Sequence, residues 1–156
     1  MKDDVTGIAY TTAVVMTAAL VAAQFVPATR TNPPVQSNLV APLPIAATLR
    51  RACYDCHSNE TRWPWYSGVA PVSWLIVRDV NFGREEVNFS KWGSYYPRTR
   101  RRKLQWMGRA LHEKEMPPWS YRLMHPGARL TEADRAGLLS WIESTLNTSS
   151  TQTSNK

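Results

Sequence analysis

Two cysteines and a histidine stand close together in the sequence Cys53-Tyr54-Asp55-Cys56-His57. On a helix this spacing brings Cys53, Cys56 and His57 to one face, because positions i, i+3 and i+4 are neighbours on the helix surface. Two thiols placed in this way can form thioether bonds to the two vinyl groups of a haem, and the adjacent imidazole can bind the iron. The motif therefore predicts one covalently attached haem c, with Cys53, Cys56 and His57 as binding residues.

Other uses of a cysteine pair fit the sequence less well. A tetrahedral zinc site needs about four ligands, and the chain has only two cysteines, so the distant His112 and His125 would have to complete it. A thioredoxin-like redox pair is expected beside a βαβ unit, and the sequence shows no such pattern. A structural disulfide leaves His57 without a role.

The residue that binds the iron opposite His57 decides what the haem does. We favour Met116, because it follows a predicted helix and precedes Pro117 and Pro118. Prolines stiffen a loop, and a weak thioether ligand needs a loop that is already in position. A methionine opposite a histidine raises the reduction potential and blocks small ligands.

Four other residues are candidates for the same position. His125 is the first alternative and would give bis-histidine ligation with a lower reduction potential, and Met124 comes next. Met107 lies within an apolar helical stripe and fits a core position better, whereas His112 fits a helix surface. An iron with an open sixth position is the remaining alternative, and it would indicate a sensor or a peroxidase.

The second ring nitrogen of His57 is expected to donate a hydrogen bond to a backbone carbonyl, which would fix the tautomer and the plane of the ring. From their distance along the chain, we expect Pro64 or Pro71 to offer that carbonyl. Tyr54 and Asp55 occupy the two variable positions of the motif. We expect them to face solvent or the haem edge and assign them no chemistry.

An uncharged and largely apolar run of twenty residues spans positions 7–26. At ~1.5 Å per residue, a helix of this length crosses a hydrocarbon core of about 30 Å. A cleaved signal peptide is the alternative, because Val21-Ala22-Ala23 resembles a cleavage site, but the run is longer than a usual signal core. We predict an uncleaved membrane anchor over residues 1–28.

The charges that flank this run do not settle its orientation. Arg30, Arg50 and Arg51 follow it and only Lys2 precedes it, which weakly favours a cytoplasmic C-terminal side. Covalent haem attachment in bacteria takes place on the outer side of the cytoplasmic membrane. We therefore predict a single-pass protein of the inner (cytoplasmic) membrane, with its haem domain on the periplasmic side.

The rest of the chain divides into three parts. Residues 29–44 are rich in proline and predict an extended linker that holds the domain off the bilayer. Residues 45–146 carry apolar residues at helical spacing and show no strand pattern, so they predict an all-α haem domain. Residues 147–156 are rich in Ser, Thr and Asn and predict a disordered tail.

Several helices of this domain can be outlined from the sequence. Prolines 44 and 97 suit first turns, and residues 71–80 predict a short helix, after which Gly83 and Asn88 indicate an irregular stretch. Thr131 to Asp134 resembles a capping box. Two apolar stripes mark the helices over 97–115 and after 131, and their members are Leu104, Met107, Gly108 and Leu111, then Leu138, Leu139, Ile142 and Leu146.

The soluble part is strongly basic. Residues 27–156 hold eighteen Lys and Arg against ten Asp and Glu, a net charge of +8, and the densest basic run is 98–103. Such a run can be a solvated helix start, a docking surface for an acidic protein, or a contact with anionic lipid headgroups. The expected partners are a membrane redox complex with an acidic surface, and lipid around the N-terminal helix. Nucleic acid is not expected outside the cytoplasm.

Taken in order, these motifs resemble the bacterial haem-binding domain family of small membrane-anchored c-type cytochromes. The resemblance covers about residues 30–146 and implies a cytochrome c-like helical haem domain, without an assigned reaction. The stretches that carry it are Thr31-Asn32-Pro33-Pro34-Val35, Cys53-Tyr54-Asp55-Cys56-His57-Ser58-Asn59-Glu60-Thr61, Trp63-Pro64-Trp65-Tyr66-Ser67, Ala70-Pro71-Val72-Ser73-Trp74, Asn88-Phe89-Ser90, Glu115-Met116-Pro117-Pro118-Trp119 and Met124-His125-Pro126.

The function expected from the sequence is that of a membrane-anchored monohaem electron carrier, not an enzyme. It would pass single electrons to or from a membrane complex such as a photosynthetic reaction centre or a respiratory oxidase. Two alternatives stay open at this point. One is a haem sensor or peroxidase with an open sixth position, and the other is a structural or relay haem subunit of a membrane complex.

Overall fold

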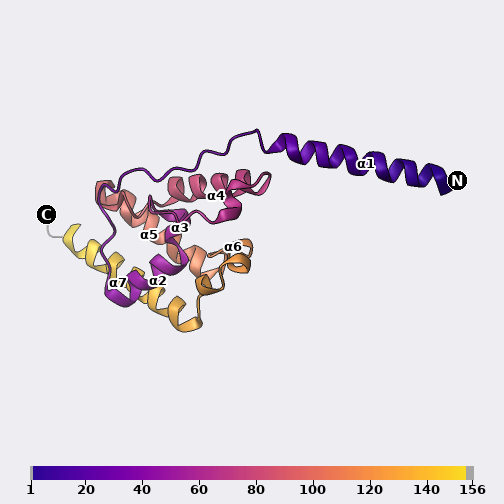
Figure 1. Ribbon diagram of the computed structural model, residues 1–156. Coiled ribbons are helices and arrows are strands. Elements are labelled where there is room, and N and C mark those ends of the chain that lie inside the picture. Colours follow the sequence, from indigo (N-terminus) through magenta and orange to yellow (C-terminus); the bar gives the residue numbers. More distant parts are fainter. Residues whose placement is uncertain (1, 154–156) are drawn as a thin grey trace.

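The computed structural model describes the backbone of residues 2–153 and the side chains of residues 5–148. Within this part of the chain every regular element is a helix, which confirms the all-α prediction (Figure 1). The elements are α1 (Lys2–Ala23), α2 (Leu43–Ala52), α3 (Tyr54–His57), η1 (Trp65–Gly68), α4 (Val72–Glu86), η2 (Trp92–Ser94), α5 (Pro97–His112), α6 (Trp119–Met124), η3 (Pro126–Ala128) and α7 (Glu132–Thr153), where η marks a short 3₁₀ helix.

The first helix, α1, projects away from the helical domain that the rest of the chain forms (Figure 1). Its segment Val5–Ala23 has a mean hydropathy of 1.8, and none of it is buried against the rest of the protein. It is long and apolar enough to cross a membrane, as the sequence predicts.

Helices α5 and α7 pack against each other and supply much of the core. The apolar stripes predicted for both helices face this contact, because residues three or four positions apart share a helix face. Leu49 of α2 and Phe89 of the segment after α4 join them. The buried members of the two stripes are Leu104, Met107, Leu111, Leu138 and Ile142.

The start of α7 has the capping box that the sequence predicts. The Thr131 hydroxyl accepts a hydrogen bond from the Asp134 backbone N–H at 3.0 Å, and the Asp134 carboxylate accepts one from the Thr131 N–H at 2.9 Å. Arg51 of α2 adds an ion pair to Asp134 at 3.0 Å. The hydrogen bonds from Thr131, followed by the contact with Arg51, lower the pKa of Asp134 to about 2, so this carboxylate stays charged and joins α2 to α7.

Helix α4 is longer than the sequence predicts. It runs without a break through Gly83 to Glu86, where the sequence predicts an irregular stretch. A Cβ atom on Gly83 would lie 2.6 Å from the carbonyl oxygen of Cys56 and 3.1 Å from the Cys56 Cβ. Gly83 therefore does not end the helix, but allows α4 to approach α3 more closely than any other residue would.

The proline-rich linker is extended but does not stand free of the domain. Backbone N–H groups of Gln36 and Ser37 donate to Ser90 O, both at 3.0 Å, and Leu39 N–H donates to Phe89 O at 2.9 Å. The linker is therefore not a free stalk, because backbone hydrogen bonds of this kind hold it along the domain surface.

The polar tail also differs from the prediction. Helix α7 continues to Thr153, so residues 147–153 are helical, and residues 154–156 lie outside the described part. Hydroxyl groups in this region donate to carbonyls one turn back, from Thr145 to Trp141 at 2.8 Å and from Thr148 to Ser144 at 2.9 Å. These local bonds let Ser and Thr side chains satisfy themselves within a helix.

Candidate functional site

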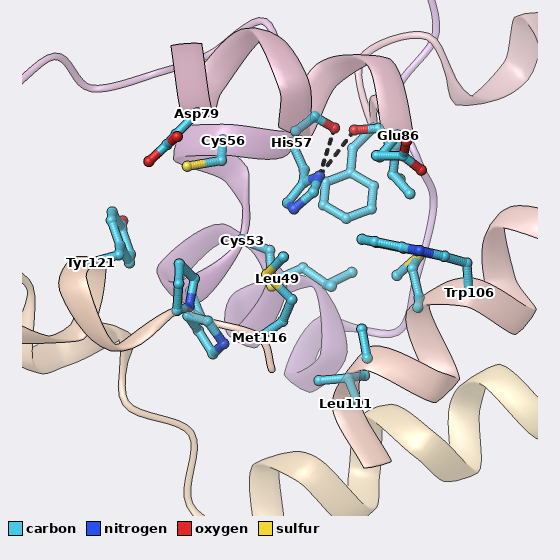
Figure 2. Close-up of a pocket in the computed structure, with 18 of the residues that line it drawn as sticks. Leu49, Cys53, Cys56, His57, Asp79, Glu86, Trp106, Leu111, Met116 and Tyr121 are labelled. Atoms are coloured by element: carbon cyan, nitrogen blue, oxygen red, sulfur yellow. Dashed lines mark hydrogen bonds between the residues drawn. The ribbon is translucent and has the colours of Figure 1, made fainter. Parts of the chain in front are cut away.

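An apolar cavity of about 270 Å³ opens among α2, α3, α4, α5 and the loop before α6 (Figure 2). Its volume is just below the range typical of small-molecule sites, roughly 300–1,000 Å³. Most of its wall is aliphatic or aromatic, with contributions from Leu49, Phe82, Val87, Phe89, Leu111 and Leu138. Such a wall suits a flat apolar ligand better than a charged one.

The structure brings Cys53, Cys56 and His57 together on the wall of this cavity. Cys53 follows the last residue of α2, and the single turn of α3 comes directly after it. The N–H groups of Cys56 and His57 both donate to Cys53 O, at 3.2 and 2.9 Å. This closed turn presents the three side chains on one face, as the spacing predicts.

Both cysteines are free thiols in an environment that keeps them neutral. Burial, followed by the neighbouring Cys56, raises the pKa of Cys53 to about 12. Burial, followed by the charges of Asp55 and Asp79, raises the pKa of Cys56 to about 12. A thioredoxin-like dithiol needs a lowered thiol pKa. Both thiol pKa values are raised here, so the two cysteines do not resemble such a dithiol.

His57 is buried, and its ring is held in one orientation. Its Nδ1 lies 2.8 Å from Gly83 O and 3.2 Å from Val87 O, as the dashed lines in Figure 2 show. Carbonyls only accept hydrogen bonds, so Nδ1 carries the proton and Nε2 keeps its lone pair. Burial lowers the pKa of His57 against the opposing effect of the two carbonyls, so the ring is neutral and able to bind a metal.

The carbonyl partners of His57 differ from the prediction. Pro64 and Pro71 were the expected acceptors, but the end of α4 supplies both carbonyls. Only the close approach at Gly83 brings this helix end within reach of the ring. The spacing of residues along the chain does not indicate this contact between α4 and His57.

Met116 lies on the opposite side of the cavity from His57 (Figure 2). It follows the end of α5, where the N–H groups of Glu115 and Met116 both donate to Ala110 O, at 3.0 and 3.4 Å. Of the candidates for a second iron ligand, Met116 and Met107 line the cavity. Met107 belongs to the core cluster, so Met116 is the candidate on a loop.

The other candidates lie outside the cavity wall. Met124 is 54% exposed on the outside of α6, and His112 is exposed at the end of α5. His125 stacks on the ring of Tyr121, with 4.1 Å between ring centres and 18° between planes. Tyr121 itself lines the cavity, whereas His125 does not.

Sequence reasoning missed the role of Asp55. This residue is buried, not solvent-facing, and it accepts hydrogen bonds from Tyr121 Oη at 2.6 Å and from Arg62 Nε and Nη2 at 3.1 Å each. Burial pushes the pKa of Asp55 upward, but the hydrogen bonds from Arg62 and Tyr121 outweigh it and hold the pKa below its usual value. The network fixes α6 to the motif turn, and its members lie too far apart in sequence to be recognised there.

Two more aromatic residues support the motif turn. Tyr54 is also buried, so of the two surroundings expected for it, solvent is wrong, and it stacks on Phe89 with 5.2 Å between ring centres. Trp106 lines the cavity and meets His57 edge-on at 6.3 Å. Of the seven tryptophans, all within the described part of the chain, Trp106 is the one on this wall.

Comparison with known families identifies the ligand class. A family model described as a haem-binding domain matches residues 18–144. This chain belongs to the haem-binding domain family. The match confirms the resemblance seen in the sequence, while no curated protein and no solved structure shows a significant match.

The cavity fits the haem that membership of this family implies. Its wall is apolar, it presents a neutral imidazole with a free Nε2, and it carries two unpaired thiols beside that imidazole. Within the described residues no group of three or more His, Cys, Asp or Glu side chains is arranged to hold a metal ion directly. The zinc alternative therefore finds no ligand set there.

The approach of α4 to α3 gives a direct test of this site. Replacing Gly83→Ala places a methyl group 2.6 Å from Cys56 O, and overpacking of this kind costs about 1–3 kcal/mol. We expect lower haem content per polypeptide and a lower midpoint in denaturant unfolding. Both are measured in detergent from the haem absorbance.

The matched control is Gly108→Ala in α5. Its new Cβ would lie 3.6 Å from Ile142 Cγ2, an ordinary contact, and Ala favours the helix interior over Gly by about 1 kcal/mol. We expect this variant to keep full haem content and to be as stable as the parent or more stable. Equal behaviour of the two variants would contradict the role assigned to Gly83.

Proposed function

We propose that this protein is a membrane-anchored monohaem c-type cytochrome that passes single electrons to or from a membrane redox complex, such as a respiratory oxidase or a photosynthetic reaction centre. The main support is that Cys53, Cys56, His57 and Met116 line one apolar cavity in a member of a haem-binding family. Each of these side chains would have a role in binding haem c.

Cys53 and Cys56 would hold the haem covalently. Each thiol would add across one vinyl group, so that a C–S and a C–H bond form while the S–H bond and the vinyl π bond are lost, without an oxidant. Both thiols are free and neutral in the cavity wall. The single turn of α3 spaces them on the same face as His57.

His57 and Met116 would be the two protein ligands of the iron. The carbonyls of Gly83 and Val87 fix Nδ1–H of His57, which leaves Nε2 for the iron and increases the basicity of the ring. Met116 would bind from the opposite wall with a weak thioether. When bound, a haem ligated in this way supplies a one-electron iron couple of raised potential.

An iron with two protein ligands would favour electron transfer over the making or breaking of bonds in a substrate. Two protein ligands would leave the iron no open position for a substrate, and the cavity around it is lined by apolar side chains such as Leu49, Leu111 and Leu138. An exposed edge is still needed for electron exit. Phe82, which lines the cavity and is 60% exposed, marks a side on which the cavity is open to solvent.

The basic run at the start of α5 would steer a partner toward this site. Arg102 and Arg98 are exposed on α5, and Arg102 lies one helical turn before Trp106, which lines the cavity. Arg100 has a structural role instead, because its guanidinium donates to Tyr95 O and Gly93 O at 2.8 Å each. Positive charge beside a redox cavity favours an acidic partner surface.

The apolar α1 supports a position at the membrane. Because haem attachment to a Cys-x-x-Cys-His motif takes place outside the cytoplasm in bacteria, we propose an inner-membrane protein with its haem domain on the periplasmic side. Tethering would raise the effective concentration of the domain near a membrane complex.

The sixth ligand is tested by Met116→Ala, with Met124→Ala as the matched control. We expect the oxidised parent to show a thioether-to-iron charge-transfer band and the reduced parent to resist carbon monoxide. In Met116→Ala the band is expected to disappear, the reduction potential to fall, and carbon monoxide to bind. Met124→Ala is expected to behave as the parent, because Met124 lies outside the cavity.

Two results would contradict this ligation. A parent that lacks the band but resists carbon monoxide would indicate a different protein ligand, with His125 the next candidate. A parent that binds carbon monoxide readily without denaturant would favour the sensor or peroxidase alternative over an electron carrier.

The steering role of α5 is tested by charge reversal, with Arg102→Glu compared with Arg129→Glu, which is also exposed. We expect Arg102→Glu to slow oxidation of the reduced protein by anionic ferricyanide by about two- to fivefold at low salt, because a charge near the cavity acts on the approaching anion. The salt dependence should flatten. A cationic cobalt oxidant should show the opposite trend, and equal effects of the two variants would contradict a docking surface on α5.

A further inference from the structure

The end of the membrane helix is fixed to one edge of the haem domain. The side chain of Gln24 donates from Nε2 to Ala70 O at 3.0 Å and accepts from Ala70 N–H at 3.1 Å. The indole N–H of Trp74 donates to Val26 O at 3.2 Å. Gln24 is the residue after α1, so these bonds hold the loop before α4 directly beside the end of the apolar helix.

This edge carries a group of large apolar side chains that the protein leaves uncovered. Trp65 is 82% exposed and Leu75 is 51% exposed. The group continues onto α6, because Tyr66 contacts His125 at the end of α6, with Oη 3.5 Å from Nε2. We call the group the apolar rim, and its members are Trp65, Val69, Val72, Leu75, Leu123 and Met124.

The apolar rim lies on the side of the domain from which α1 leaves. Figure 1 shows the start of α4 and helix α6 at this end, while α5 begins at the opposite end. The basic run 98–103 is therefore turned away from the membrane helix. The end that carries the strongest positive charge and the end that carries the apolar rim are separate parts of the surface.

We propose that the apolar rim rests in the headgroup region of the bilayer that α1 crosses. The inference rests on the membrane anchoring in the proposed function and adds an orientation to it. A bilayer is favoured over other occupants because the rim is continuous with the end of the apolar helix. An exposed Trp beside a Tyr is also typical of a membrane interface, and Arg30, which contacts Ser67 Oγ at 3.4 Å, adds a cation for lipid phosphate.

This orientation brings the haem cavity close to the membrane surface. Leu75 of the rim and Phe82 of the cavity wall are seven residues apart on α4, or about 10 Å along the helix. Helix α6 makes the same connection, since Tyr121 lines the cavity and Leu123 belongs to the rim. An electron partner would then be reached in the plane of the membrane, not at the end of a flexible stalk.

The test uses single cysteines in the full-length haem-loaded protein, with one copy in each lipid nanodisc. Leu75→Cys and Leu123→Cys report on the rim. Leu43→Cys reports on the start of α2, where the Leu43 side chain is 86% exposed, and Val15→Cys reports on the interior of α1. The measurement is the rate of reaction with a charged, membrane-impermeant maleimide. The unsubstituted protein gives the background from Cys53 and Cys56.

We expect both rim cysteines to react about tenfold more slowly than Leu43→Cys, because a thiol pKa raised by about one unit in the interface reduces the reactive thiolate about tenfold. Val15→Cys should not react. Rim cysteines that react as fast as Leu43→Cys, with Val15→Cys protected, would overturn the proposed orientation and leave the membrane span intact. Reaction at Val15→Cys would overturn both the proposal that α1 spans the membrane and the proposed position of the rim.

A second variant tests what holds the rim in place. Gln24→Ala removes both side-chain hydrogen bonds to Ala70, and we expect the rim cysteines to react several-fold faster in that background. Gln105→Ala, an exposed position on α5, is the matched control and should leave the rates unchanged. Equal rates in the two backgrounds would overturn the role of Gln24 in holding the domain against the bilayer.

Discussion

The structure of the site depends on the contact between α3 and α4. Gly83 has no side chain, so α4 comes close enough for two carbonyls to hold the His57 ring, those of Gly83 and of Val87, the residue after the helix. A ring fixed in this way keeps a neutral Nε2 directed at the cavity, and the same turn sets the two thiols beside it. If α4 moved outward by the space of one methyl group, His57 would lose both hydrogen bonds and its tautomer would no longer be determined.

The parts of the fold that depend on local spacing could be predicted from the sequence. The motif turn, the apolar stripe of α5 and the capping box at Thr131 each involve residues a few positions apart, and each is present. Gly83 shows why the rest could not be predicted. Glycine normally weakens a helix, and only the position of Cys56 across the contact explains why a helix continues there. The burial of Asp55 depends in the same way on Tyr121, a residue distant in sequence.

The two ends of the domain have different surfaces. The end beside α1 is apolar and held by hydrogen bonds to the segment that leaves the helix. The far end, where α5 begins (Figure 1), carries the basic run 98–103. The cavity lies between them, on helices α4, α5 and α6, so a domain held in the proposed orientation would keep the cavity close to the membrane surface. The linker, which packs along the domain through Gln36 and Leu39, is consistent with such a fixed arrangement.

The central claim is that haem is bound covalently through Cys53 and Cys56. The most direct measurement is the mass of the denatured full-length protein, made after extraction with acidified acetone, for the parent and for the Cys53→Ala/Cys56→Ala variant. The account predicts that the parent keeps the mass of one haem and its colour, because two thioether bonds survive denaturation, and that the double variant loses both. Loss of haem from the parent during extraction would contradict covalent attachment and, with it, the assignment as a c-type cytochrome.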